Sequence, residues 1–279
     1  MKLHNKFQKL YAILIIKSNN AEDFVMWLDW YEKFIKCDKI VIINDNSDIA
    51  IVNYINNYDN IILIDNLFSK DNQIENYNSV IQEILKPNID DIIIMPDFDE
   101  FWWYDTTKFN SFIECAMNEF IKFKTNSVCV PWTNMMCKDL LEERPWYIMN
   151  YNDLCKYRVN ISITEIKPII LYNGKPFENV HHGLKDFKTI TNINLDENKK
   201  GIIFAETDYT YYLRLYHYRI TTILEYNNKI KTSLIKKNIR NNKRIYMNKD
   251  IHKYLTETNQ YPHTLDLTVD DVLKTINTL

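Results

Sequence analysis

Short runs of apolar residues, each followed by polar residues, recur through the first third of the chain. They occupy residues 11–16, 39–44, 60–65 and 91–95. Runs of this length that are bounded by turn residues are typical of buried strands. We therefore predict four strands, and the polar residues after each one mark the end where a ligand could bind.

The segments between these runs have a helical pattern. Residues 21–36 place Phe24, Trp27 and Tyr31 three and four positions apart, as on one face of a helix. A second helix is predicted over 73–85, where Pro87 ends it, and a short one over 49–58. Alternating strands and helices favour right-handed crossovers and a mainly parallel sheet, which is an α/β fold.

The pattern becomes less regular after residue 106. A helix is predicted over 109–123 and a strand over 127–132, followed by strand-like pieces at 166–172 and 210–216. Residues 192–200 are charged and predict a loop, and 221–238 predict an amphipathic helix. With no linker or internal repeat, the sequence predicts one domain with a less regular C-terminal part.

Three carboxylates follow the fourth predicted strand directly. Asp97, Asp99 and Glu100 come after Pro96 and precede four aromatic residues. Crowded carboxylates repel one another unless a cation or a proton lies between them. Oxygen ligands of this kind suit Mg²⁺ or Mn²⁺, which often bridge them to a phosphate. The alternative is a polar turn that merely closes the strand.

Composition excludes several classes of nucleotide site. The chain has only 3 glycines in 279 residues, so it has neither a Walker loop nor the Gly-rich dinucleotide fingerprint. Its net charge of −3 gives no reason to expect a nucleic-acid partner. A nucleotide would have to be held by side chains, ordinary backbone and metal.

Cysteine usage and hydropathy bear on the compartment. The 5 cysteines form no C-x-x-C pair, which favours reduced thiols. Residues 1–10 have no apolar signal region, and the longest apolar runs are far too short for a membrane span. We therefore expect a soluble, cytoplasmic protein.

A basic run follows in the C-terminal part. Residues 229–249 hold 8 basic side chains and no acid. Such a run is usually a solvated helix face, and the alternative is contact with an anionic membrane surface or an acidic acceptor.

Several short motifs occur in an order that resembles a known group of enzymes. They are Ile15–Tyr31, Ile42–Ser47, Gln73–Asn78, Met95–Phe101, Val130–Trp132, His181–His182 after Lys167–Pro168, and Tyr216–Arg219 with Glu225, Tyr226 and Lys229. Over roughly residues 11–230 the chain resembles glycosyltransferase family 92 and related family-2-like glycosyltransferases. The resemblance implies a GT-A fold, Rossmann-like with flanking helices.

The resemblance also implies that residues 1–279 form a single domain in which different segments bind different substrates. Residues 1–105 would bind the nucleotide, 106–220 the acceptor, and 221–279 would form a helical basic tail.

Roles for single residues follow from the same resemblance. The nucleotide-sugar donor would contact residues on the strand ends, the second helix and the C-terminal half: Lys17, Asn19, Asp45, Asn46, Gln73, Tyr77, Asp97 and Arg219. Asp97, Asp99 and His217 would hold Mn²⁺ or Mg²⁺ on the diphosphate. Glu100 and His181 are the candidate catalytic residues.

The chain departs from the family pattern at two places. Ser18-Asn19-Asn20 precedes Glu22 where the family has an acidic residue nearer the first strand. Thr221-Thr222 stands where the family often has Lys-Ser, and Arg219 would replace that lysine.

The predicted function is a metal-dependent, inverting glycosyltransferase of the hexosyltransferase class. Its donor would be a UDP- or GDP-sugar and its acceptor a glycan, a lipid-linked molecule or a protein. Asp97 and Asp99 lie too close together for the carboxyl pair of a glycoside hydrolase. The remaining alternative is a non-catalytic carbohydrate- or nucleotide-binding protein. Each histidine has an alternative interpretation. His217 could be a hydrogen-bonded core residue of its strand, and His181 could merely occupy a loop. Glu100 could support the metal site or act as a base.

Overall fold

The structure is a computed structural model. It describes residues 8–16, 21–45, 55, 58–65, 69, 72–136, 157–159, 166–179, 183–189, 202–204 and 212–217. The predicted short helix at 49–58 lies almost entirely outside these residues. The predicted loop at 192–200 and the helix and basic tail after residue 220 lie outside them too.

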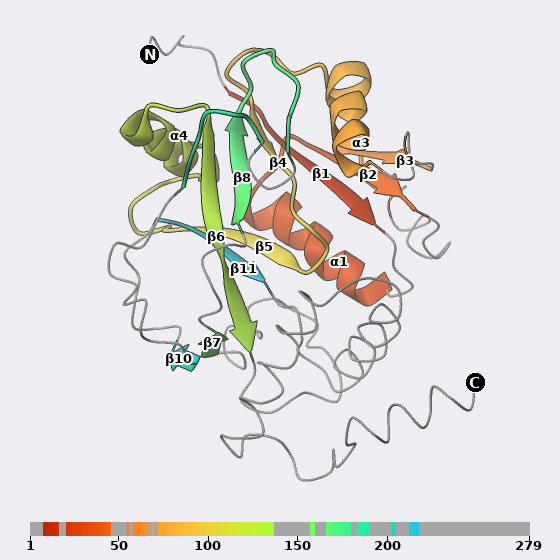
Figure 1. Ribbon diagram of the computed structural model, residues 1–279. Helices are drawn as coiled ribbons and strands as arrows, with labels where there is room; N and C mark the ends of the chain where they lie inside the picture. The colour runs from red at the N-terminus through yellow and green to blue at the C-terminus, as the bar shows by residue number, and fades with distance from the viewer. Residues whose placement is uncertain are drawn as a thin grey trace, which may run out of the picture.

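A parallel sheet forms the N-terminal half, as the sequence predicted. Its strands are β1 (Leu10–Ile16), β2 (Lys39–Asn44), β3 (Ile61–Ile64) and β4 (Ile92–Ile94). They lie in the order β3-β2-β1-β4, and each neighbouring pair is parallel (Figure 1). The α/β fold class is confirmed.

Antiparallel strands extend the sheet beyond β4. β8 (Ile166–Leu171) pairs antiparallel with β4, and β6 (Ser127–Met136) pairs antiparallel with β8. Three short strands complete this part: β9 (Phe187–Thr189) parallel to β6, β7 (Tyr157–Val159) antiparallel to β6, and β10 (Ile202–Phe204) antiparallel to β7.

A two-stranded ribbon pairs with the second half of β6. β5 (Glu100–Tyr104) pairs antiparallel with β11 (Leu213–His217), and β11 also pairs parallel with β6. The sequence predicted a strand near β11 but none at β5. The turn Asp97–Glu100 therefore joins the parallel sheet directly to this ribbon.

The helices begin and end where capping side chains and left-handed residues allow. α1 (Ala21–Asp29) continues as a π-helical turn, η1 (Trp30–Phe34). α3 (Gln73–Ser79) begins at Asn72, whose side chain accepts bonds from two backbone N–H groups, and continues as η2 (Val80–Leu85). α4 (Phe112–Phe123) begins at the Ser111 cap. Lys86 and Lys124 end the last two with positive φ angles of 46° and 51°.

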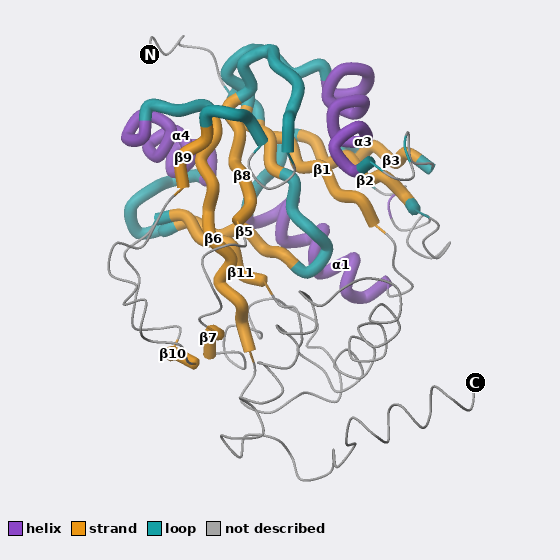
Figure 2. Tube along the Cα trace, viewed as in Figure 1, coloured by secondary structure: helices purple, strands orange, loops and turns teal. Residues whose placement is uncertain are grey.

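Both faces of the parallel sheet are buried, and alternate residues of each strand face opposite sides. Leu14 and Ile42 pack with Trp27 of α1, whereas Ile13 and Val41 pack with Tyr77 of α3. Figure 2 shows helices flanking the strands in this way. Strands covered on both faces have continuous apolar runs rather than alternating ones, which explains the pattern in the sequence. Among the described residues no helix is long and apolar enough to cross a membrane.

Candidate functional site

The turn after β4 lies at the point where the strand order reverses. The chain passes from β1 outward to β2 and β3, then returns to the other side of β1 as β4. Ligands of open α/β sheets bind outside the carboxyl ends of the strands at such a point. Asp97 and Asp99 follow the carboxyl end of β4 and therefore lie there.

Glu100 closes the turn from inside. Its backbone N–H donates to the carbonyl of Asp97 at 3.1 Å, and its Oε2 accepts the N–H of Asp97 at 2.7 Å. Its side chain is fully buried. The two bonds fix the backbone between Asp97 and Glu100, so the carboxylates of the turn occupy defined positions.

Aromatic side chains of the first helix hold the turn from the other side. Trp27 Nε1 donates to the carbonyl of Asp97 at 3.2 Å, and the Tyr31 hydroxyl donates to the carbonyl of Glu100 at 3.0 Å. The same hydroxyl accepts the N–H of Trp102 at 3.1 Å. Because Trp27 and Tyr31 are themselves fully buried, the turn rests on the core rather than on solvent-exposed contacts.

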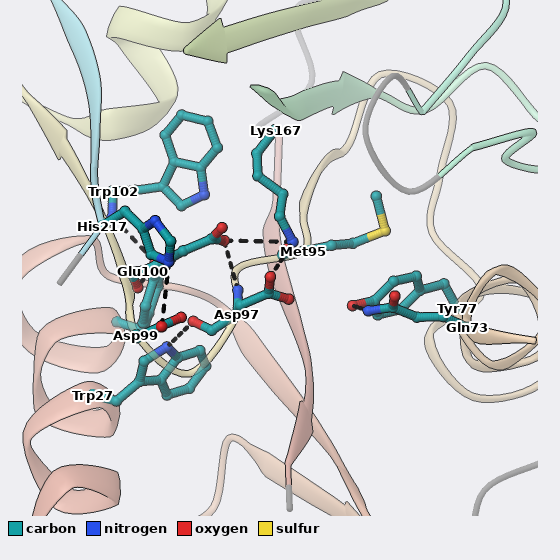
Figure 3. Close-up of polar contacts among 11 residues, drawn as sticks. Trp27, Gln73, Tyr77, Met95, Asp97, Asp99, Glu100, Trp102, Lys167 and His217 are labelled. Atoms are coloured by element: carbon teal, nitrogen blue, oxygen red, sulfur yellow. Dashed lines mark hydrogen bonds and ion pairs between the residues drawn. The ribbon is translucent and has the colours of Figure 1, made fainter. Parts of the chain in front are cut away.

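A buried lysine from β8 contacts the turn. No function was predicted for this lysine from the sequence. Lys167 Nζ lies 2.9 Å from Asp97 Oδ2 and 3.5 Å from Glu100 Oε2 (Figure 3). It also donates to the carbonyl of Met95 at 3.5 Å. Since β8 runs antiparallel to β4, the start of β8 lies beside the end of β4. The available signal was a single lysine inside the apolar run 166–172.

The cluster shifts the pKa of both buried groups. Burial raises the pKa of Glu100 well above its usual range and the charge of Asp97 raises it further, while the Lys167 ammonium opposes them. Burial alone would lower the pKa of Lys167, but the carboxylates of Glu100 and Asp97 outweigh it and the pKa is raised. Lys167 therefore stays protonated.

His217 lies against the second aspartate. Its Nε2 is 3.2 Å from Asp99 Oδ2 (Figure 3). The side chain of His217 is 5% exposed and that of Asp99 is 28% exposed. His217 reaches this place because it is paired with Glu100 across the β11–β5 ribbon. The pair joins an imidazole to a carboxylate that solvent can reach, and its role as a metal site stays a prediction.

Other predicted donor residues lie at the end of β2 and on α3. The N–H of Asp45 donates to the carbonyl of Ile16 at 2.8 Å, which places the end of β2 beside the end of β1. Gln73 Nε2 donates to the Tyr77 hydroxyl at 2.9 Å, and Figure 3 shows both across from Asp97. Burial raises the pKa of Tyr77, so its hydroxyl keeps the proton.

Five of the predicted site residues lie outside the described residues. They are Lys17, Asn19, Asn46, His181 and Arg219. Their predicted roles are untouched by the structure.

The donor atoms present fit a divalent ion in part. In the described part of the chain no three His, Cys, Asp or Glu side chains form a ready-made metal cluster. Asp99 and His217 supply one oxygen and one nitrogen donor within 3.2 Å of each other. A diphosphate and water would have to complete the coordination, as is usual where a metal binds together with a phosphate substrate.

These features define an α/β protein with a carboxylate-bearing turn at the switch point of a parallel sheet. No family model and no curated protein matches the sequence. Among solved structures, S. aureus TarS 1–349 is similar over 46% of this chain and 36% of that chain, with 16% identity and a TM-score of 0.32. The complex of the same protein with UDP gives a TM-score of 0.31.

A 4-diphosphocytidyl-2C-methyl-D-erythritol synthase is similar over 45% of this chain and 60% of that chain, with 12% identity and a TM-score of 0.31. The chain thus spans between 36% and 60% of the length of these structures. The similarity is partial.

Proposed function

We propose that the chain is a metal-dependent glycosyltransferase of GT-A type that moves a hexosyl group from a UDP- or GDP-sugar to an acceptor hydroxyl with inversion. The observation that supports this most is the turn Asp97–Glu100 at the switch point, with His217 beside Asp99. The order of motifs in the sequence supports the same class.

In this proposal Asp99 and His217, with Asp97 next to them, hold Mn²⁺ or Mg²⁺. When bound, the ion would neutralise the charge that develops on the departing nucleoside diphosphate. In the same proposal the nucleotide would be held by Asp45, which follows β2 beside the end of β1, and by Gln73, the first residue of α3.

Glu100 has a different role from Asp99 in this proposal, because its carboxylate is buried. Its side chain is fully buried and its Oε2 already accepts the N–H of Asp97. An acceptor hydroxyl cannot reach a side chain in that position. Of its two predicted roles, burial favours supporting the metal site, through the shape of the turn, over acting as the base. His181 is left as the proposed residue on the acceptor side.

The test is release of nucleoside diphosphate from a panel of UDP- and GDP-sugars in Mn²⁺, with and without EDTA. We expect release in Mn²⁺, none in EDTA, and a loss of about 100-fold in Asp99→Asn, the scale of a lost electrostatic contact to the leaving group. Asp59→Asn is the matched control, because Asp59 is an exposed carboxylate before β3, at the opposite edge of the sheet.

Two results would speak against the proposal. Release that is insensitive to both EDTA and Asp99→Asn would remove the metal from the mechanism. Mn²⁺-dependent nucleotide binding without turnover on any acceptor mixture would favour the non-catalytic binding protein instead.

A further inference from the structure

Lys167 is a buried cation placed against the carboxylate turn. Its side chain is 3% exposed, whereas that of its partner Asp97 is 42% exposed. A donor phosphate therefore has access to Asp97 but not to the ammonium. Lys167 can therefore act at this site only through the groups that it contacts, which are Asp97, Glu100 and the carbonyl of Met95.

The backbone that carries Lys167 is held on both sides. β8 lies between β4 and β6, all six of its residues are buried, and Lys167 itself pairs with Val130 of β6. The ammonium is thus delivered to the turn from the interior of the sheet. Burying an ammonium group costs free energy and is tolerated only where the charge is paired and hydrogen-bonded. Lys167 meets this condition, because its Nζ has three oxygen partners.

The ammonium lies between two carboxyl groups that would otherwise repel each other. The backbone N–H of Asp97 donates to Glu100 Oε2, and Lys167 Nζ contacts the carboxylates of both residues. The ammonium therefore offsets the charge of Asp97 at the turn and leaves Asp99 as the carboxylate beside His217.

We propose that Lys167 is a positioning residue: it takes Asp97 as its partner and locks the turn so that Asp99, beside His217, presents its carboxylate to the divalent cation. This inference rests on the proposed metal-dependent function and narrows it. Asp97 then serves the site as the counter-ion of Lys167 rather than as a metal ligand.

Two rival roles predict different results. If Asp97 is itself a ligand, losing it weakens metal binding whether or not Lys167 is present. If Lys167 acts only as a nearby positive charge, removing it reduces repulsion of the metal and strengthens binding. A positioning role predicts that either single loss weakens binding, because it leaves one charge of the pair without its counter-ion and so disturbs the turn. The two losses together leave neither charge and should largely restore binding.

The experiment measures the dissociation constant of Mn²⁺ alone, by electron paramagnetic resonance of the free ion, for the full chain and four variants: Lys167→Met, Asp97→Asn, the double variant and Asp99→Asn. The double variant keeps the net charge of the wild-type turn, which makes it the matched control. We expect each of the first two changes to raise the constant about tenfold, the scale seen when a partner of a metal ligand is lost. We expect the double variant to lie within about threefold of wild type, as the scatter of non-additive pairs allows.

Each other outcome overturns the inference. A double variant as weak as Asp97→Asn makes Asp97 a ligand, and tighter binding in Lys167→Met makes the lysine a plain charge. If Lys167→Met does not fold, Lys167→Gln takes its place, because the direction of the change in the single lysine variant separates a positioning role from a plain charge. Absence of Mn²⁺ binding in wild type both alone and with UDP or GDP present, or unchanged binding in Asp99→Asn, would instead overturn the proposed function.

Discussion

His217 and Asp99 are far apart in the chain and meet because β11 pairs with β5. A histidine in a strand of alternating apolar residues is more often a hydrogen-bonded core residue than a ligand. Here the imidazole is nearly buried but faces a carboxylate that solvent reaches. That combination favours a ligand whose orientation is fixed by its surroundings.

We expect His217→Ala to raise the Mn²⁺ concentration for half-maximal activity about tenfold, because the ion loses its nitrogen donor. The measurement is activity as a function of Mn²⁺ at a saturating nucleotide-sugar. Tyr216→Phe is the control, since Tyr216 is the preceding residue and keeps its ring in the core. An unchanged Mn²⁺ requirement in His217→Ala would return His217 to the role of a core histidine.

The two aspartates were visible in the sequence because an apolar run ends directly before them. Lys167 was not predicted to act, because only the antiparallel pairing of β8 with β4 brings it to the turn. Nor could spacing indicate that Glu100 points inward while Asp97 and Asp99 reach solvent. A turn that reverses the chain assigns its side chains to different environments, and sequence alone carries no sign of which.

The strands and helices of the parallel half could be predicted closely. Strands at 11–16 and 39–44 match β1 and β2, and the helix predicted over 73–85 is α3 followed by η2. β5 was missed because it begins only a short turn after β4, where its aromatic residues looked like the continuation of a loop. Strands predicted at 127–132 and 166–172 correspond to β6 and β8, but their antiparallel pairing was not predicted, because the paired segments are distant in the chain.

The loop after β8 depends on one glycine. Gly183 has a φ of +68°, and a Cβ there would lie 2.4 Å from Ile170 Cδ1 on β8. The loop is tied to α3 by Asn78, whose side chain donates to the carbonyl of Phe177 and accepts its N–H. The loop therefore has little freedom to move away from a new methyl group.

We expect Gly183→Ala to lower the free energy of unfolding by about 1–3 kcal/mol, through left-handed strain and the clash with Ile170. Urea unfolding measures it. Gly174→Ala is the control: its φ is +81°, but its Cβ would lie 3.3 Å from the side chain of Ile89, which is exposed. A loss in Gly183→Ala no larger than in Gly174→Ala would mean that the loop moves aside.

On the scale of the molecule, the described strands form one sheet with a parallel half and an antiparallel half. The two halves meet where β4 pairs with β8. The candidate site lies on the line between the halves and takes Asp97 and Asp99 from one and Lys167 and His217 from the other. Binding at the site should therefore stabilise the fold as a unit.

We expect Mn²⁺ at 100 times its dissociation constant to raise the free energy of unfolding by about 2.7 kcal/mol relative to EDTA, because the ion binds the folded state. Urea unfolding in the two conditions measures it. Asp99→Asn should unfold at the same urea concentration in both. Equal stabilisation of that variant would place the ion elsewhere on the protein.

The pairing of β11 with both β5 and β6 has a consequence for how the protein folds. Among the described strands β11 is the last in the chain and the only partner of β5. Contacts between such distant segments close large loops and form slowly. During synthesis, the apolar strand β5 would wait with an unpaired edge until β11 emerges, which is the kind of edge that attracts other chains. The candidate site is complete only when β11 pairs with β5, because β11 carries His217 to Asp99. The site would therefore form in the same step that covers the exposed edge of β5.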